Sequence, residues 1–210
     1  MRIRVSFAKT SAMRFTGHLD LFRTWERVIR RAGLPLAYSQ GFNPHPRMAL
    51  ACALPLGFTS QAEMIDIWLE TDGDLAAVQA ALEKAAPPGI QIQALEVVDS
   101  HLPALQTVVD SAEYTITLLE ACPKLDERLE ALLASESLPR QRRGKDYDLR
   151  PLILSVERLA NEPRTGFPQL KAVLTAREAA TGRPEELLEA LEIDPLAARV
   201  HRTKLILVGG

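Results

Sequence analysis

The chain has 210 residues, a length that suits one large domain or two small ones. Hydrophobic residues make up 47% of it and charged residues 25%, which is typical of a folded globular protein and excludes a disordered chain. The formal net charge is −2. No apolar run approaches the length of about 18 residues that a membrane span needs, and the first residues lack the apolar core of a signal peptide. We therefore expect a cytoplasmic protein with no membrane segment.

The first half of the chain predicts the element order βαββαβ. Alternating side chains over 2–8 predict a half-buried strand, and an apolar stripe over 18–32 predicts a helix that ends at Gly33. Further strands are expected over 47–54, 62–70 and 90–98, and a second helix over 74–86. This order is typical of a ferredoxin-like sandwich, in which helices cover one face of an antiparallel sheet.

The second half repeats this pattern after a boundary at residue 103. Strands are expected over 113–119, 137–143, 151–159, 168–176 and 199–208, helices over 123–134 and 184–191, and an extra turn or strand near 144–151. No sequence identity between the halves supports a duplication, so it rests on the order of elements alone. We therefore predict an α+β protein of two tandem ferredoxin-like sandwiches, residues 1–103 and 104–210.

Cys52 and Cys122 are the two cysteines of the sequence, and they lie far apart in it. Structural zinc and iron–sulfur clusters need three or four closely placed ligands, so we predict neither a metal site nor a cofactor. Both cysteines lie in apolar segments, and we interpret them as buried thiols in a reducing compartment.

Charge is distributed unevenly along the chain. Residues 1–50 hold nine basic and two acidic side chains, whereas residues 51–100 hold one basic and eight acidic side chains. This asymmetry favours an anionic partner at the amino-terminal surface. The alternative is that the two oppositely charged blocks face each other within one domain.

The first predicted helix has a basic flank beside its apolar stripe. Arg23, Arg27 and Arg30 are spaced i, i+4, i+7, and Arg31 lies four residues after Arg27. Phosphate groups would relieve the repulsion between these like charges, so the flank is a candidate RNA-binding surface. The alternative is a solvated helix face that nearby acids partly neutralise.

The segment 41–47, Gly-Phe-Asn-Pro-His-Pro-Arg, predicts a stiff loop, because a residue before proline is restricted to extended conformations. Such a loop would present Asn43, His45 and Arg47 to RNA with little loss of conformational entropy. Phe42 can stack on a base or fill the core, and the core is the better interpretation. A structural turn without a ligand is the alternative for the whole loop.

The segment 16–20, Thr-Gly-His-Leu-Asp, lies at the start of the first helix. Thr16 or His18 can cap this helix, and Asp20 suits its first turn. The helix dipole disfavours a charged imidazole here, so His18 would stay neutral and accept a proton. His18 and His45 are candidate catalytic residues if the fold brings the loop beside the helix start, and a capping role is the alternative.

A second basic segment spans residues 140–150. Arg142, Arg143 and Lys145 flank a glycine, which is typical of a phosphate-contacting hairpin, and Tyr147 adds a stacking surface. Acidic residues within the segment weaken this prediction.

Several motifs extend over nearly the whole chain. They are 16–21 Thr-Gly-His-Leu-Asp-Leu, 31–46 Arg-Ala-Gly-Leu-Pro-Leu-Ala-Tyr-Ser-Gln-Gly-Phe-Asn-Pro-His-Pro, 53–57 Ala-Leu-Pro-Leu-Gly, 148–153 Asp-Leu-Arg-Pro-Leu-Ile, 181–188 Thr-Gly-Arg-Pro-Glu-Glu-Leu-Leu and 201–202 His-Arg. Together they resemble the radical SAM-linked protein family, although Gly17 stands where that family often has serine. In that family the domain is encoded beside a radical SAM enzyme or fused to one. The resemblance implies an accessory role for such an enzyme and brings no established catalytic residues.

Three functional hypotheses follow from these patterns. The first is a non-catalytic accessory or substrate-binding module that works with a radical SAM enzyme and binds RNA or a ribosome-associated assembly. The second is an RNA-processing or RNA-modifying enzyme with His18 as base and Arg47 as phosphate clamp, which requires these residues and His45 to converge on one cleft. The third is a protein–protein scaffold whose helix arginines contact an acidic partner.

Overall fold

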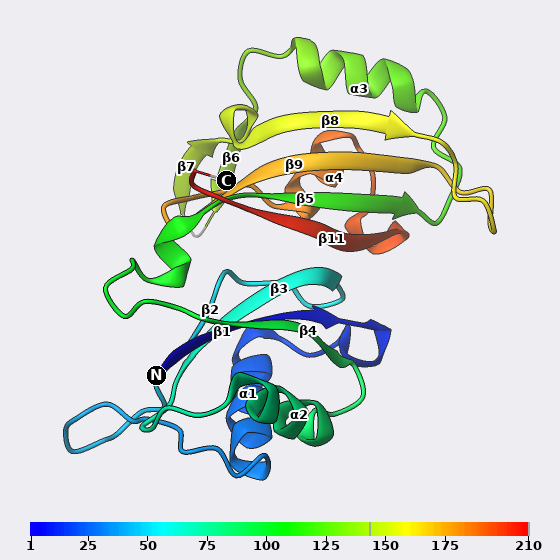
Figure 1. Cartoon of the computed structure of the whole chain (residues 1–210). Coiled ribbons are helices and arrows are strands. Elements are labelled where there is room, and N and C mark those ends of the chain that lie inside the picture. The colour runs from blue at the N-terminus through cyan, green and yellow to red at the C-terminus, as the bar shows by residue number, and fades with distance from the viewer. Residues whose placement is uncertain (143, 210) are drawn as a thin grey trace. The chain divides into compact units, whose positions relative to one another are not determined.

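The computed structural model describes residues 1–142 and 144–209, and the described residues form an α+β protein with four α-helices (Figure 1). The α+β class is as predicted. The chain divides into two compact units, Met1–Val109 and Asp110–Gly210, and the division falls a few residues after the predicted boundary at residue 103. None of the described helices is long and apolar enough to cross a membrane.

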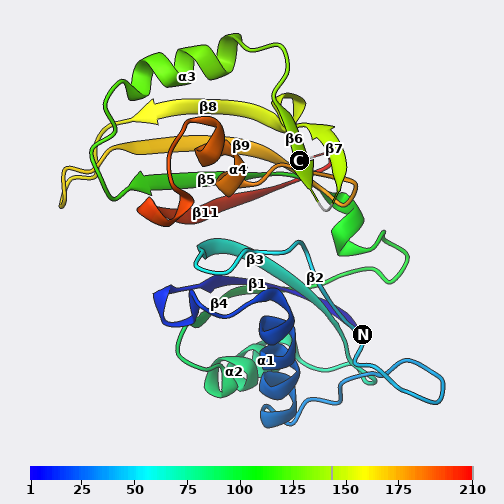
Figure 2. The same cartoon turned by 180° about the vertical axis from the view of Figure 1, so that it is seen from behind.

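Unit 1 has the predicted order of strands and helices. Its elements are β1 (Arg2–Lys9), the short 3-10 helix η1 (Ser11–Met13), α1 (His18–Arg31), β2 (Met48–Leu50), β3 (Thr59–Trp68), α2 (Leu75–Ala85), β4 (Ile90–Val97) and the 3-10 helix η2 (Leu105–Val108). The strands pair antiparallel in the order β4-β1-β3-β2. Both α-helices cover the same face of this sheet (Figures 1 and 2). The chain bends after Leu50, so β2 is shorter than expected.

The apolar face of α1 forms much of the core of unit 1. Trp25 is fully buried, and its ring meets the ring of Phe7 from β1 edge to face at 4.8 Å between centroids. The helix ends where predicted, at Gly33, whose φ of 69° allows its amide to donate to the carbonyl of Arg30 at 3.1 Å. This termination places the last basic residues of α1 beside the loop that follows.

A buried ion cluster joins β1 to β3 in unit 1. Arg2 donates to Asp66 Oδ2 at 2.6 Å from Nη2 and 3.0 Å from Nε, and Arg4 Nε donates to Asp66 Oδ1 at 2.8 Å. Asp66 is fully buried, and Arg2 donates three further hydrogen bonds to carbonyls of the segment 99–103. Arg2 therefore fixes the segment after β4 to the first strand.

This cluster corrects part of the prediction from charge. Arg2 and Arg4 share the Asp66 carboxylate of the acidic block, Arg4 also lies 3.9 Å from Glu96 Oε1, and Lys9 is buried with its ammonium 3.2 Å from the carbonyl of Phe58. These three cations are internal and contribute nothing to an anion-binding surface. The alternative of opposed charge blocks thus holds for β1, and the remaining basic residues of the first fifty are Arg14 after η1, the arginines of α1, and Arg47 in the segment after α1.

Unit 2 has nine strands and helices in the described residues, besides short 3-10 turns. They are β5 (Val109–Leu118), α3 (Leu125–Ala134), β6 (Pro139–Arg142), β7 (Lys145–Asp148), β8 (Ile153–Leu159), β9 (Gln169–Arg177), β10 (Ala180–Thr181), α4 (Pro184–Ala190) and β11 (Ala198–Leu207). The main strands are ordered β8-β9-β5-β11, β10 pairs with the end of β9, and β6 and β7 form a separate hairpin. The extra strand expected near 144–151 is β7.

The two cysteines differ from their predicted environment. Cys52 in unit 1 and Cys122 in unit 2 are not joined in a disulfide, and each is only half-buried. In the described part of the chain, no group of three or more His, Cys, Asp and Glu side chains could hold a metal ion.

Candidate nucleic-acid interface

A groove of about 510 Å³ lies between α1 and the turn that follows α2 in unit 1. It is lined by Thr24, Arg27, Arg30 and Arg31 of α1, by Met13 of η1, and by Pro87 and Pro88. Three of the four arginines predicted on the basic flank therefore open into one cavity, whose other wall is apolar. Its volume lies within the range of ordinary ligand sites.

Two of these arginines have no counter-ion among the described residues. Neither Arg27 nor Arg31 makes an ion pair or a side-chain hydrogen bond with any residue that the structure describes, and both are exposed. Arg23, one turn earlier, does not line the groove and lies 3.5 Å from the carboxylate of Asp20. The pairs of Asp20 with Arg23 and of Glu26 with Arg30 agree with the alternative of a solvated, partly neutralised helix face, and they leave the charges of Arg27 and Arg31 open to solvent.

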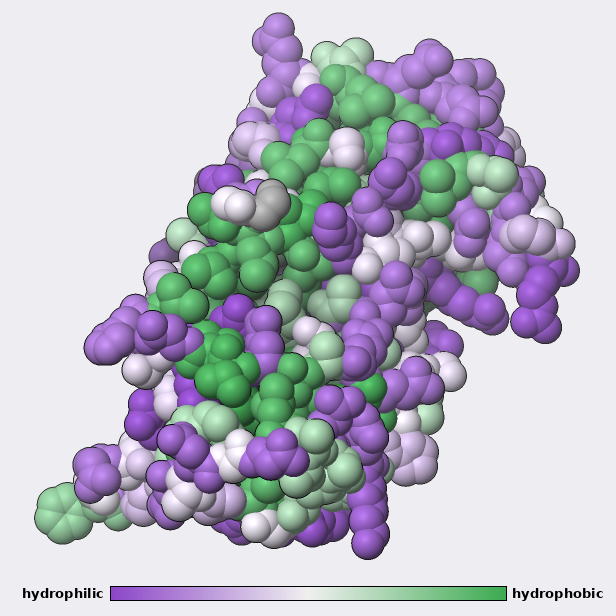
Figure 3. Space-filling model, in the orientation of Figure 1, coloured by the Kyte–Doolittle hydropathy of each residue, from purple (hydrophilic) through white to green (hydrophobic). Residues whose placement is uncertain are grey.

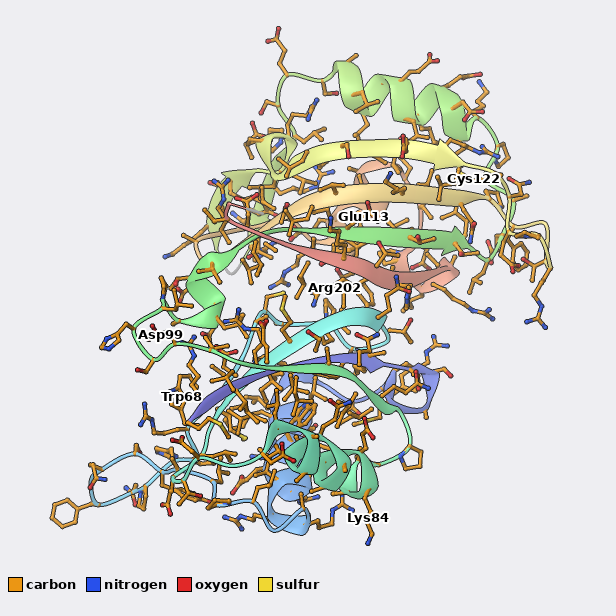
Figure 4. All side chains as sticks on the ribbon, viewed as in Figure 1. Trp68, Lys84, Asp99, Glu113, Cys122 and Arg202 are labelled. Atoms are coloured by element: carbon orange, nitrogen blue, oxygen red, sulfur yellow. The ribbon has the colours of Figure 1, made fainter. Side chains whose placement is uncertain are left out.

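Arg30 links the groove to the loop after α1. Its Nη2 lies 2.8 Å from Glu26 Oε1 and donates to the hydroxyl of Tyr38 at 2.9 Å. The hydrogen bond to Tyr38, and to a smaller extent the nearby Glu26 carboxylate, raise the pKa of the Arg30 guanidinium, so it stays charged at all physiological pH values. Lys84, in the last turn of α2, adds another exposed cation in unit 1 and extends into solvent (Figure 4).

Gly89 holds the apolar wall of the groove in place. Its φ of +102° is a conformation that residues with a side chain rarely adopt, and a Cβ there would lie 2.5 Å from Met13 Cγ. The carbonyl of Gly89 accepts a hydrogen bond from the amide of Thr10 at 2.9 Å. Sequence reasoning treated this Pro-Pro-Gly turn only as the end of a helix. The signal in the sequence that this turn has a fixed shape was the proline pair followed directly by a glycine.

The loop 39–45 is braced at its base. Tyr38 and Pro46 form an isolated β-bridge, the amide of Ser39 donates to the carbonyl of His45 at 2.8 Å, and the amide of His45 donates to Ser39 Oγ at 2.9 Å. Pro44 in the loop and Pro46 at its base both follow trans peptide bonds. The segment extends away from the sheet of unit 1 (Figure 1), and Phe42 is fully exposed at 105%. The prediction that Phe42 fills the core is wrong, because the braced loop holds this ring in solvent, away from the core of unit 1.

The other predicted residues of the loop are also accessible. Asn43 and His45 are exposed. Arg47 is exposed as well, and its guanidinium carbon lies 5.3 Å from the centroid of Trp68, the last residue of β3 (Figure 4). A cation–π contact positions a guanidinium without cancelling its charge, so Arg47 remains a cation at the base of the loop.

The structure does not bring the two candidate catalytic histidines together. His18 is the first residue of α1, whereas the loop with His45 is tied through Tyr38 to Arg30 in the last turn of the same helix. A helix of this length separates its ends by about 20 Å. The N-cap residue of α1 is Gly17, so the prediction that Thr16 or His18 occupies the cap position is wrong. Asp20 lies in the first turn, as expected.

The second basic segment forms the predicted hairpin, but its arginine serves the fold of unit 2. Arg142 Nη2 lies 2.6 Å from Glu186 Oε2 on α4, and its guanidinium carbon lies 5.0 Å from the Tyr147 ring centroid. Because this ion pair neutralises Arg142, we remove it from the predicted RNA-binding set. Lys145 is exposed, and Arg143 lies outside the described residues.

The fold and the groove define an α+β protein with a cationic cavity and no resident metal site in its described part. A family model described as "Uncharacterized protein conserved in bacteria (DUF2344)" matches residues 2–184, and the chain belongs to this family. The family description names no radical SAM enzyme, so that part of the sequence resemblance stays a prediction.

Comparisons with other known proteins add information on the fold only. No curated protein matches the chain. Among solved structures, the chain is similar to one described as "Crystal Structure of a Cbf5-Nop10-Gar1 Complex", with a TM-score of 0.52 and 9% identity. The match covers 97% of this chain and 48% of the other, so this chain spans about half the length of that relative. At this identity the likeness is one of fold alone.

Proposed function

We propose that this protein is a non-catalytic RNA-binding module whose groove beside α1 holds the phosphate backbone. The observation that carries the proposal is that Arg27 and Arg31 line an open groove without a counter-ion from the described residues. A phosphate chain would supply that missing charge and release bound counter-ions. The opposite wall, formed by Met13, Pro87 and Pro88, offers apolar contact to sugars and bases.

We further propose that both units are ferredoxin-like and that they arose by duplication. Unit 1 runs β1-α1-β2-β3-α2-β4, with the strand order β4-β1-β3-β2. If the β6–β7 hairpin and β10 are taken as insertions, unit 2 runs β5-α3-β8-β9-α4-β11, with the strand order β11-β5-β9-β8. The two units thus agree both in the order of elements along the chain and in the order of strands in the sheet, which supports a ferredoxin-like arrangement in each.

A radical SAM enzyme is the proposed protein partner, and only the sequence resemblance supports it. The test is co-purification of such an enzyme with the tagged protein from extracts treated with nuclease. Recovery of the enzyme after nuclease treatment would support a direct contact, whereas its loss would mean that RNA alone bridges the two proteins.

The RNA proposal is tested by titrating a labelled structured RNA at two salt concentrations. The variant Arg27→Glu with Arg31→Glu removes both uncompensated cations of the groove. A matched control is Arg199→Glu with Lys204→Glu on β11, since both residues are exposed, neither forms an ion pair with a described residue, and the change in net charge is the same.

We expect the groove variant to lose at least about tenfold in affinity and to show a weaker salt dependence, by about 0.7 in the log–log slope for each lost phosphate contact. The control should lose much less. Equal losses in the two double variants, or no binding by the unaltered protein, would overturn the proposal. Tighter binding of polyglutamate than of RNA would instead favour the scaffold hypothesis.

A further inference from the structure

We infer that the RNA bound in the groove is single-stranded and that the loop 39–45 stacks one unpaired base on Phe42. The inference rests on the proposed function, because the groove is taken to hold the phosphates of that same strand. It goes beyond the proposed function in naming the class of RNA that binds and the residue that selects this class.

The first supporting observation is the presentation of Phe42. Its ring is fully exposed, although one backbone hydrogen bond, one hydrogen bond from a backbone amide to the Ser39 hydroxyl and one β-bridge brace the loop that carries it. In Figure 3 the segment that carries the loop protrudes from unit 1 and ends in a hydrophobic tip. An exposed aromatic ring does not help to pack the core of the unit. On a braced loop, however, a base can stack on the ring with little loss of conformational entropy of the loop.

The second observation is the connection between the loop and the groove. Arg30 lines the groove, and its guanidinium donates to the hydroxyl of Tyr38 at the base of the loop at 2.9 Å. Arg47, at the other side of that base, keeps an exposed cation. A strand that leaves the groove past Arg30 therefore meets the loop next, with a further cation available for its backbone.

The chemistry of nucleic acids then selects the class of ligand. In a duplex the faces of the internal bases are covered by their neighbours, so an aromatic side chain cannot stack on them without first separating two stacked base pairs. A single strand exposes its base faces, and stacking on an aromatic ring tolerates any base sequence. Phe42 thus favours single strands, whereas the groove arginines bind any phosphate chain.

The experiment compares an oligouridine of about 12 nucleotides with a duplex RNA of the same length, both titrated into the full chain. Four proteins are used: unaltered, Phe42→Ala, Phe42→Trp, and Arg27→Glu with Arg31→Glu. We expect Phe42→Ala to lose about tenfold in affinity for oligouridine and nothing for the duplex. Phe42→Trp should keep the affinity and report binding by fluorescence quenching beyond that of Trp25 and Trp68 in the unaltered protein.

The outcomes separate the two proposals. Loss of both ligands in the arginine variant, with unchanged oligouridine binding by Phe42→Ala, would overturn the stacking inference and leave the RNA-binding groove intact. Unchanged binding in all variants would overturn both proposals, as would an absence of binding by the unaltered protein. Thermal unfolding is the folding control, since truncation of a fully exposed side chain should leave the melting temperature unchanged.

Discussion

Arg30 in the last turn of α1 donates to the hydroxyl of Tyr38 from Nη2 at 2.9 Å and from Nε at 3.3 Å. Arg30 lines the groove, and Tyr38 begins the loop whose tip is Phe42. These bonds are the direct contact between the two parts of the proposed RNA surface. The ring of Tyr38 also packs against the core of unit 1, so the loop base is anchored on both sides.

Tyr38→Phe should loosen the loop without unfolding the protein. The variant keeps the packed ring and removes the acceptor for Arg30. Because this bond lies at the surface, we expect the free energy of unfolding to fall by less than about 1 kcal/mol. Amide hydrogen exchange in residues 39–45 should become faster. Arg23→Gln, which removes a guanidinium from the same helix without touching the loop, is the control, and equal exchange rates in the two variants would contradict the prediction.

Asp66→Ala should be strongly destabilising. It leaves Arg2 buried and Arg4 largely buried without the carboxylate that they share, and breaking such a pair costs about 3–5 kcal/mol. Urea unfolding followed by circular dichroism measures the loss. Asp72→Ala is the control, because Asp72 is exposed and meets the terminal amine at 3.5 Å, and it should change stability by less than about 0.5 kcal/mol. A cost below about 1 kcal/mol for Asp66→Ala would show that the cluster is not needed.

Gly89→Ala should destabilise unit 1 and deform the groove. The added Cβ would meet Met13 at 2.5 Å, and the φ of +102° would strain any residue other than glycine, so we expect a loss of about 1–3 kcal/mol. Gly73→Ala is the matched control, because the nearest atom to its Cβ is Val78 Cγ2 at an ordinary 3.8 Å. Calorimetric unfolding compares the two variants. Equal melting temperatures would mean that the Pro87–Gly89 turn can shift without cost.

Stability should decrease at mildly acidic pH because of His201. Burial lowers the pKa of this imidazole from its ordinary value of 6.5, so protonation disfavours the folded state. Between 6.5 and the lower folded value, the unfolded chain binds more protons, and the free energy of unfolding therefore falls as the pH falls through this window. His201→Gln should flatten that part of the pH profile. The exposed His101→Gln is the control, and a profile that His201→Gln leaves unchanged would contradict the prediction.

The regular elements could be predicted from the sequence because each depends on local periodicity. The apolar spacing of α1 and the glycine after it predicted both the helix and its end. The same spacing predicted the basic flank, since positions three and four apart share a helix face. Local patterns thus predicted the part of the candidate site that lies on a single element, the basic flank of α1.

Contacts between distant residues could not be predicted in this way. Nothing near Arg2 indicates that Asp66 is its partner, and nothing in the hairpin indicates that Glu186 neutralises Arg142. Phe42 was assigned to the core because large apolar residues are usually buried, but the pairing of Tyr38 with Pro46 directs the loop outward. Charge counts along the sequence therefore overstated the cationic surface, and residue type alone placed an exposed side chain in the core.

The three hydrogen bonds from Arg2 to the segment 99–103 set a limit on how unit 1 can be excised. A fragment cut just after β4 would expose a guanidinium that has lost three of its five side-chain hydrogen bonds, and its first strand would be less firmly held. A fragment that extends through Val109 keeps those carbonyls and the buried Leu105. Limited proteolysis should accordingly spare the 99–103 segment even though much of its surface faces solvent.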